Sequence, residues 1–553
     1  MSAFEHGVAS FDPLTDRVLL WTRVAPLTRA VRWRVAVAPD HPTATPGELL
    51  ADVVSEGEAS VDPDGDGCVT IDVGGLEPAT TYHYWFEVDG DRSPVGRTRT
   101  LPSATEWARL SFVCCADRSM GELSAYRAIA EDEVDLVVHL GDYLYEEPKG
   151  PFEVDPPGVT VTLEDYRRRH AHTRLDPDLQ ALHLRHPVVF VWDDHDSADN
   201  AWRHGAKGHN EEQHGRWEDR LAAAARARTE WLPARLTDPT DLLDMHRGFR
   251  LGDLLEVLVL DTRIPGRDQP SGDEGAKPLD DPDRRIVLDE QMDWVEARLA
   301  DHACTWALVA SQVPVAPLEL PMPDGPVDVL LDDALPSGYR VIDGEAVCTD
   351  LWEGYPVQLE RLARALDARA GTVVVVSGDV HSNWAALVPD PTGERAVAPD
   401  FVTSSVSATA MGEQLPPGWR KVVDAVVDRD VLDAVWSDLE HHGYLRVDVR
   451  PDEVRADWIA AEPGEHPLSP ATIASWAMSL GLPVELHPGV PSSSIASFHD
   501  VRRPSVPLPP RREPLGREPR STMEAKGRAR LVAGALVVAL AVATAWWWRR
   551  HRR

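Results

Sequence analysis

The chain has 553 residues, of which 43% are hydrophobic and 27% are charged, so it is a globular protein long enough for several domains. Its formal net charge of −35 excludes a typical nucleic-acid-binding protein, and it means that an anionic substrate must be drawn in by local positive charge. The five cysteines have neither the spacing of a zinc ribbon nor that of a disulfide framework.

Residues 1–103 are typical of an all-β domain. Short alternating or aromatic segments at 16–24, 31–39, 68–76 and 81–90 are separated by Pro, Gly and Asp turns. We expect an N-terminal β-sandwich here, similar to a fibronectin type III domain.

Residues 104–484 alternate between predicted strands and predicted helices, which indicates an α/β catalytic domain with parallel strands. The strands are expected within 109–117, 134–147, 187–196, 254–263, 305–315 and 372–384, with a further pair in 443–462. Helices are expected within 121–132, 289–302 and 355–369.

The C-terminal part differs in composition. Residues 485–527 are rich in Pro, Arg and Ser and are predicted to be a linker. Within 528–553, the uncharged stretch 531–548 is flanked by basic residues, which predicts a C-terminal transmembrane helix; a buried soluble helix is the alternative. No signal peptide is visible after Met1. We therefore expect a single-pass protein of the cell membrane, and both membrane faces stay open.

Four apolar strands are each followed directly by side chains that can bind metal. Taken singly, Asp142 could be a helix cap and Cys115 an inert buried thiol. The carboxyl ends of parallel strands, however, meet in one crevice, and a cluster of buried acids needs positive charge there. We interpret the set as a dinuclear metal centre, with Cys115 and Asp117 after the first strand, Asp142, Tyr143 and Tyr145 after the second, Asp193, Asp194 and His195 after the third, and Asp379 and His381 after the fourth.

The order C-x-D, "HLGDYLYEE", "VWDDHD" and "SGDVHSNW" resembles the PhoD-like alkaline phosphatases of the calcineurin-like metallophosphoesterase superfamily. Further stretches, including "HRGFRLGDLLEVLVLDTR" and "PDFVTSSVSA", are similar to the same family. The resemblance covers roughly residues 4–460. It implies a metallophosphoesterase-type α/β/β/α sandwich preceded by the N-terminal β-sandwich domain.

The resemblance also implies a ferric ion, Fe(3+), together with calcium ions, Ca(2+). Cys115 and Tyr145 would hold the ferric ion with His381, and Asp142 would bridge the metals. Asp379 would lie on the calcium side, and the remaining candidate oxygen ligands are Asp194, Asn200 and Asp117.

Two residues are candidates for catalysis. His195 is expected beside the leaving group, where it would donate a proton or stabilise charge. Arg263 is expected either to contact the phosphate or to pair with an acid such as Asp261. Asp193 and Asp196 are expected to support the ligands rather than to bind metal.

The predicted function is metal-dependent hydrolysis of phosphate esters, as an alkaline phosphatase or phosphodiesterase, by a metal-bound hydroxide or oxide at a dinuclear or larger Fe/Ca centre. One alternative is a nucleotide-directed phosphodiesterase. Another is a non-catalytic, membrane-tethered protein that uses the phosphatase scaffold for binding. We expect a monomer with a phosphate-ester substrate and without a nucleic-acid partner.

Overall fold

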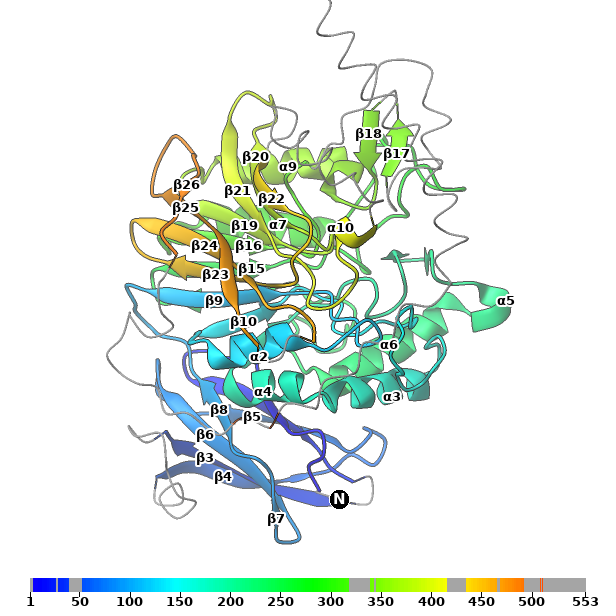
Figure 1. The fold of residues 1–553 in the computed structure, drawn as a ribbon, viewed down its shortest axis with the longest axis vertical. Coiled ribbons are helices and arrows are strands. Elements are labelled where there is room, and N and C mark those ends of the chain that lie inside the picture. The colour runs from blue at the N-terminus through cyan, green and yellow to red at the C-terminus, as the bar shows by residue number, and fades with distance from the viewer. Residues whose placement is uncertain are drawn as a thin grey trace, which may run out of the picture.

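The computed structural model describes residues 3–25, 28–38, 52–317, 339–342, 345–414, 434–464, 468–491, 508 and 510. Two large β-sheets dominate these residues, and helices cover their outer faces (Figure 1). A smaller sheet lies at the N-terminal end of the molecule (Figure 1).

The first large sheet has ten strands in the order β26-β25-β24-β23-β9-β10-β11-β1-β2-β5. Its centre is the parallel set β9 (Ala108–Val113), β10 (Leu136–His139) and β11 (Pro187–Phe190), all of whose residues are buried. Near-continuous apolar strands of this kind are expected where both faces of a parallel sheet are covered. The flanking strands are β23 (Gly443–Val449), β24 (Glu453–Ala460), β25 (Ala471–Ser479) and β26 (His487–Pro488) on one side, and β1 (Val8–Phe11), β2 (Arg17–Arg23) and β5 (Cys68–Gly74) on the other.

The second large sheet has seven strands in the order β14-β15-β16-β19-β21-β20-β22. Along its strands the side chains alternate between two cores: Val374 and Val376 join the core shared with the first sheet, whereas Val373 and Val375 join the core under the helices. The strands are β14 (Arg247–Leu251), β15 (Leu255–Val259), β16 (Trp306–Ala310), β19 (Val373–Ser377), β20 (Asn383–Pro389), β21 (Ala396–Val402) and β22 (Ala434–Asp438).

Helices complete an α/β/β/α arrangement. Helices α2 (Ser124–Glu131) and α4 (Pro177–Arg185) lie outside the first sheet, and α7 (Asp289–Ala300) and α9 (Pro356–Asp367) pack on the second (Figure 1). The predicted helices within 121–132, 289–302 and 355–369 are therefore present. Helix α4 was not predicted from the sequence, nor were α3 (Leu163–Arg174) and α6 (Trp217–Trp231), which pack against each other beside the first sheet.

The N-terminal strands are divided between two sheets. Strands β3 (Ala30–Val37), β4 (Val53–Ser60), β6 (Thr81–Val88), β7 (Asp91–Arg92) and β8 (Gly96–Arg99) form the smaller sheet. Strands β1, β2 and β5 pack against it through a shared core but belong to the ten-stranded sheet, in which β1 pairs in parallel with β11. One layer of the N-terminal sandwich thus continues into the catalytic sheet.

The predicted fold class needs a correction at its C-terminal end. Across the part of the chain that the structure describes, no helix is long and apolar enough to cross a membrane. The predicted transmembrane segment, 528–553, lies outside the described residues, as does most of the predicted linker, 485–527. The fold class is accordingly an α/β fold with several sheets, and we withdraw the transmembrane helix and the membrane localisation that depended on it.

Candidate metal centre

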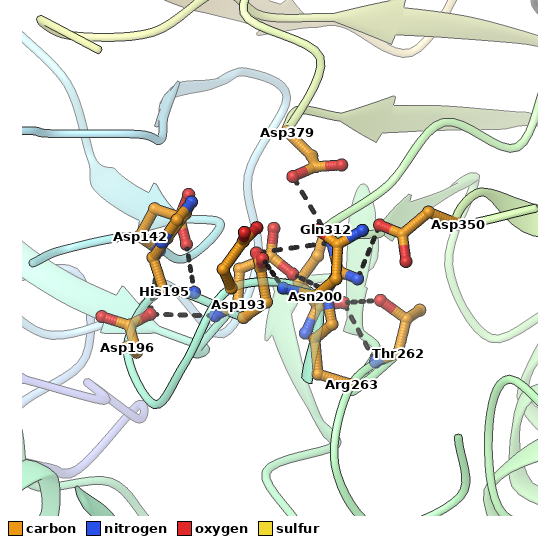
Figure 2. A network of polar contacts seen from close by, with 12 residues as sticks. Asp142, Asp193, His195, Asp196, Asn200, Thr262, Arg263, Gln312, Asp350 and Asp379 are labelled. Atoms are coloured by element: carbon orange, nitrogen blue, oxygen red, sulfur yellow. Dashed lines mark hydrogen bonds and ion pairs between the residues drawn. The ribbon is translucent and has the colours of Figure 1, made fainter. Parts of the chain in front are cut away.

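The candidate site lies where strands of both large sheets end. Cys115 follows β9, Asp142 follows β10, Asp193 and Asp194 follow β11, and Asp379 follows β19 of the second sheet. The sequence predicts that these four strand ends converge, and the structure brings them together. Figure 2 shows the acidic side chains facing one another across the two sheets.

Three groups of side chains each offer ligand atoms that lie within 4.8 Å of one another. Asp142 belongs to all three, so it is the residue that joins them. The groups are Cys115 with Asp142 and His381, Asp142 with Asp194 and His195, and Asp142 with Asp193, Asp194 and Asp379.

The backbone at the site is in an uncommon conformation. Nine non-glycine residues of the described chain have φ in the left-handed region, and five of them are predicted metal ligands. Such conformations cost free energy in side-chain-bearing residues, and they cluster at functional sites. The five residues are Cys115 (58°), Asp142 (53°), Asn200 (49°), Asp379 (68°) and His381 (50°).

Tyr145 and His381 meet at the same place. The Tyr145 hydroxyl lies 3.1 Å from His381 Nε2, and His381 Nδ1 lies 2.9 Å from the Thr409 carbonyl oxygen. Because a carbonyl oxygen only accepts, Nδ1 carries the proton and donates it, which leaves Nε2 unprotonated as the ligand atom. Burial lowers the pKa of His381 to about 4, so the ring is neutral, as metal binding requires.

His195 is held by a carboxylate that the sequence analysis missed. Its Nδ1 lies 2.7 Å from Oε2 of Glu146, a buried side chain whose Oε1 accepts the Asp199 backbone N–H at 2.8 Å. Burial alone would lower the pKa of His195, but the charges of Glu146, Asp194 and Asp142 raise it well above its usual value. Glu146 stands four residues after Asp142 in "HLGDYLYEE", and its position in this motif is the sequence feature that could have identified it as a site residue.

Arg263 lies inside the acidic cluster, and its side chain is fully buried. Its Nε pairs with Asp193, and its Nη1 lies 2.9 Å from Asp350 Oδ2 (Figure 2). Its Nη2 is 3.5 Å from Asp194 Oδ1 and 3.4 Å from Asp379 Oδ1. The sequence left two interpretations of Arg263 open, a contact with phosphate and a pairing with an acid. The structure shows Arg263 paired with acids. Asp350, which also binds Arg267, was not predicted, since it follows a region without recognisable strands or helices.

Two further predicted ligands have other contacts. Asp117 Oδ1 accepts from the Ser119 backbone N–H at 2.8 Å and from the Ser119 hydroxyl at 2.7 Å, and Asp117 belongs to none of the three groups. Asn200 approaches the cluster through its backbone N–H, which donates to Asp194 Oδ2 at 2.6 Å.

The donor set fits metal ions. Burial raises the pKa of Asp142, Cys115 and Tyr145 well above their usual values, and it raises that of Asp379 to about 7. Asp142 Oδ2 is buried and has no hydrogen-bond partner among the residues that the structure describes. Multivalent cations would stabilise the ionised carboxylates, thiolate and phenolate and would give this oxygen a partner.

Known proteins resemble this chain over most of its length. The family model of the PhoD-like phosphatases matches residues 110–458, and the model of their N-terminal domain matches residues 1–102. Alkaline phosphatase D of Bacillus subtilis (strain 168) is 31% identical over 495 residues, which are 83% of this chain and 79% of that protein. A solved structure described as "Structure of PhoD" has a TM-score of 0.73 and 29% identity, covering 87% of this chain and 91% of that one.

These matches agree with the strand-end motifs and with the clustered ligand groups. The chain therefore belongs to the PhoD-like phosphatases and is a metal-dependent phosphoric ester hydrolase.

Proposed function

We propose that the chain hydrolyses phosphate monoesters or diesters at a centre of one ferric ion and calcium. The observation that carries this proposal is the position of Asp142 in all three ligand groups, because one carboxylate can bind two cations. When bound, the metal ions supply positive charge to the phosphate oxygens and lower the pKa of a water molecule.

The ligands divide by chemistry. Cys115, Tyr145 and His381 would hold the ferric ion with Asp142, because thiolate and phenolate suit iron better than calcium. Asp379 and Asp194 offer the carboxylate oxygens that calcium prefers, and Asn200 and Asp117 are further oxygen ligands in this proposal.

The proposal includes a domain layout. The N-terminal domain would span residues 1–103, the catalytic domain residues 104–484 and the linker residues 485–527.

His195 would face the oxygen of the leaving group. Its Nδ1 is engaged by Glu146, so its Nε2 is the atom that would donate a proton to the leaving oxygen, which departs as the alcohol. The pairing also fixes the orientation of the ring, which stacks on Tyr145 with ring centroids 4.2 Å apart. Arg263 would act within the centre, where its charge offsets those of Asp193 and Asp379.

The experiment is hydrolysis of p-nitrophenyl phosphate and of bis-p-nitrophenyl phosphate by the purified protein, with metal analysis before and after a chelator. We expect iron and calcium in the active protein, and loss of hydrolysis when they are removed. Hydrolysis that continues without either metal would refute the proposed centre. The ratio of the two activities separates a monoesterase from a diesterase.

A further inference from the structure

One carboxylate beside the site belongs to none of the three ligand groups and yet binds the backbone of two ligand loops. Asp196 is buried, with 3% of its surface exposed. We define the first ligand loop as residues 140–145, after β10, and the second as residues 191–196, after β11. The first carries Asp142 and Tyr145, and the second carries Asp194 and His195.

Both oxygens of Asp196 accept hydrogen bonds from backbone N–H groups of these loops. Oδ2 accepts from Asp142 at 2.8 Å and from Asp193 at 2.9 Å. Oδ1 accepts from Tyr143 at 3.0 Å and from Leu144 at 3.4 Å. The acceptor capacity of the carboxylate is therefore largely used by backbone, and Asp196 is in none of the three ligand groups.

Other contacts between the loops involve side chains of the candidate site, among them the stacking of Tyr145 on His195 with ring centroids 4.2 Å apart. In the described chain, the last backbone–backbone hydrogen bond between the two strands runs from the Val191 N–H to the His139 carbonyl oxygen, at 3.0 Å. Beyond it, Asp142 Oδ1 accepts the His195 N–H at 3.1 Å, but Asp142 is also a candidate metal ligand. Asp196 is thus a link between the two loops whose side chain belongs to none of the candidate ligand groups.

The loops also approach each other closely at Gly141. A Cβ atom there would lie 2.4 Å from both Cβ and the backbone nitrogen of Asp193, and φ of Gly141 is +108°. The close approach at Gly141 and the four hydrogen bonds to Asp196 both fix the position of one loop relative to the other.

We propose that Asp196 is a positioning residue that holds the two ligand loops in their metal-binding arrangement before metal binds. The inference rests on the proposed function, in which Asp142 and Asp194 are ligands. Holding the loops in advance saves the free energy of ordering them on binding, so it raises metal affinity.

The first test compares Asp196→Asn with Asp400→Asn. An Asn at 196 replaces one acceptor oxygen with an amide that faces backbone N–H groups. Asp400 is a matched control, since it is buried and accepts from the backbone N–H groups of Val315 and Ala316 at 2.7 and 3.0 Å, neither of which is a predicted ligand. We expect both variants to lower the melting temperature. Asp196→Asn alone should weaken iron and calcium retention, by about 10- to 100-fold in a competition with chelator. Unchanged retention in Asp196→Asn would overturn the proposal.

The second test needs no variant and so remains decisive if Asp196→Asn does not fold. Hydrogen exchange is measured on peptides covering 140–145 and 191–196 in the unsubstituted protein, before and after chelation. We expect both peptides to stay protected after chelation, because Asp196 holds them. Loss of protection in both would mean that metal organises the loops, and it would overturn the proposal. An unsubstituted protein that binds no metal would refute the proposed function instead, and its exchange would still decide the role of Asp196.

Discussion

At the scale of single residues, the pair formed by Glu146 and His195 offers a sharp test of how the site works. Glu146 is buried, it contacts Nδ1 of the His195 ring, and its charge raises the pKa of His195. Its neighbour Glu147 has a side chain that is 49% exposed and pairs only loosely with Lys149, at 3.7 Å. The two glutamates therefore differ in role despite being adjacent.

We predict that Glu146→Gln lowers kcat by about 10- to 100-fold, the range typical of residues that orient groups at a metal site. The amide can still accept a hydrogen bond, but it cannot stabilise a charged imidazolium. Steady-state kinetics with p-nitrophenyl phosphate measures this effect. Glu147→Gln serves as the control and should keep the kcat of the unsubstituted protein. Equal kcat values for the two variants would exclude the proposed role of Glu146.

Asp142 is the second residue-scale test. Asp142→Asn removes the charge common to all three ligand groups, so metal content should fall and activity should drop by more than about 100-fold, beyond the loss typical of supporting residues. Because burial disfavours the ionised carboxylate, the melting temperature of the metal-free protein should change little. Turnover that survives the substitution would show that Asp142 does not join the metals.

At the scale of elements, the site depends on how strands end. The apolar segments at 109–117, 134–147, 187–196 and 372–384 were predicted as strands because each is a short apolar segment that ends in polar residues, and β9, β10, β11 and β19 lie within them. Helix α6 was not predicted, although "LAAAARAR" has high helix propensity, because it lacks a clear amphipathic pattern. Asp350 and Arg267 could not be assigned from sequence, since their contact depends on the packing of loops far apart in the chain.

The turn between β10 and its ligand loop gives the element-scale prediction. Gly141→Ala places a Cβ atom 2.4 Å from Asp193 and forces a side-chain-bearing residue to φ +108°. We expect at least about 1–3 kcal/mol of destabilisation from the backbone strain, with reduced metal content. Urea unfolding and metal analysis test both. Gly158→Ala is the control, because no atom of the described part of the chain lies within 4 Å of the added Cβ and φ is not in the left-handed region. Comparable stability of the two variants would contradict the close approach of the loops.

At the scale of the whole molecule, the N-terminal part and the catalytic part share a sheet. The sequence predicted a β-sandwich over 1–103, but local alternation does not reveal that β1 pairs with β11, a strand about 180 residues later. The buried ion pair between Arg247 of β14 and Asp12, just after β1, adds a second connection, with Nε–Oδ2 at 2.8 Å and Nη2–Oδ1 at 2.9 Å. Arg247 also donates to the Phe190 carbonyl oxygen at 2.7 Å, so one side chain joins both large sheets to the N-terminal strands.

We predict that Arg247→Ala destabilises the protein by about 3–5 kcal/mol, since it leaves the Asp12 carboxylate buried without its partner. Arg364→Ala is the control, because its side chain is 67% exposed and its pair with Glu360 should contribute less than about 1 kcal/mol. Unfolding in urea measures both, and a single transition in the unsubstituted protein is expected. Two separate transitions, with only one moved by Arg247→Ala, would mean that the N-terminal part folds independently.

The central claim is that Cys115, Asp142, Tyr145 and His381 hold a ferric ion, and the visible absorption spectrum of the purified, active protein tests it most directly. We predict a tyrosinate-to-iron charge-transfer band that disappears on chelation together with activity and is absent from Tyr145→Phe, because that variant lacks the phenolate oxygen. A protein that hydrolyses phosphate esters without such a band, or whose band persists in Tyr145→Phe, would contradict the account.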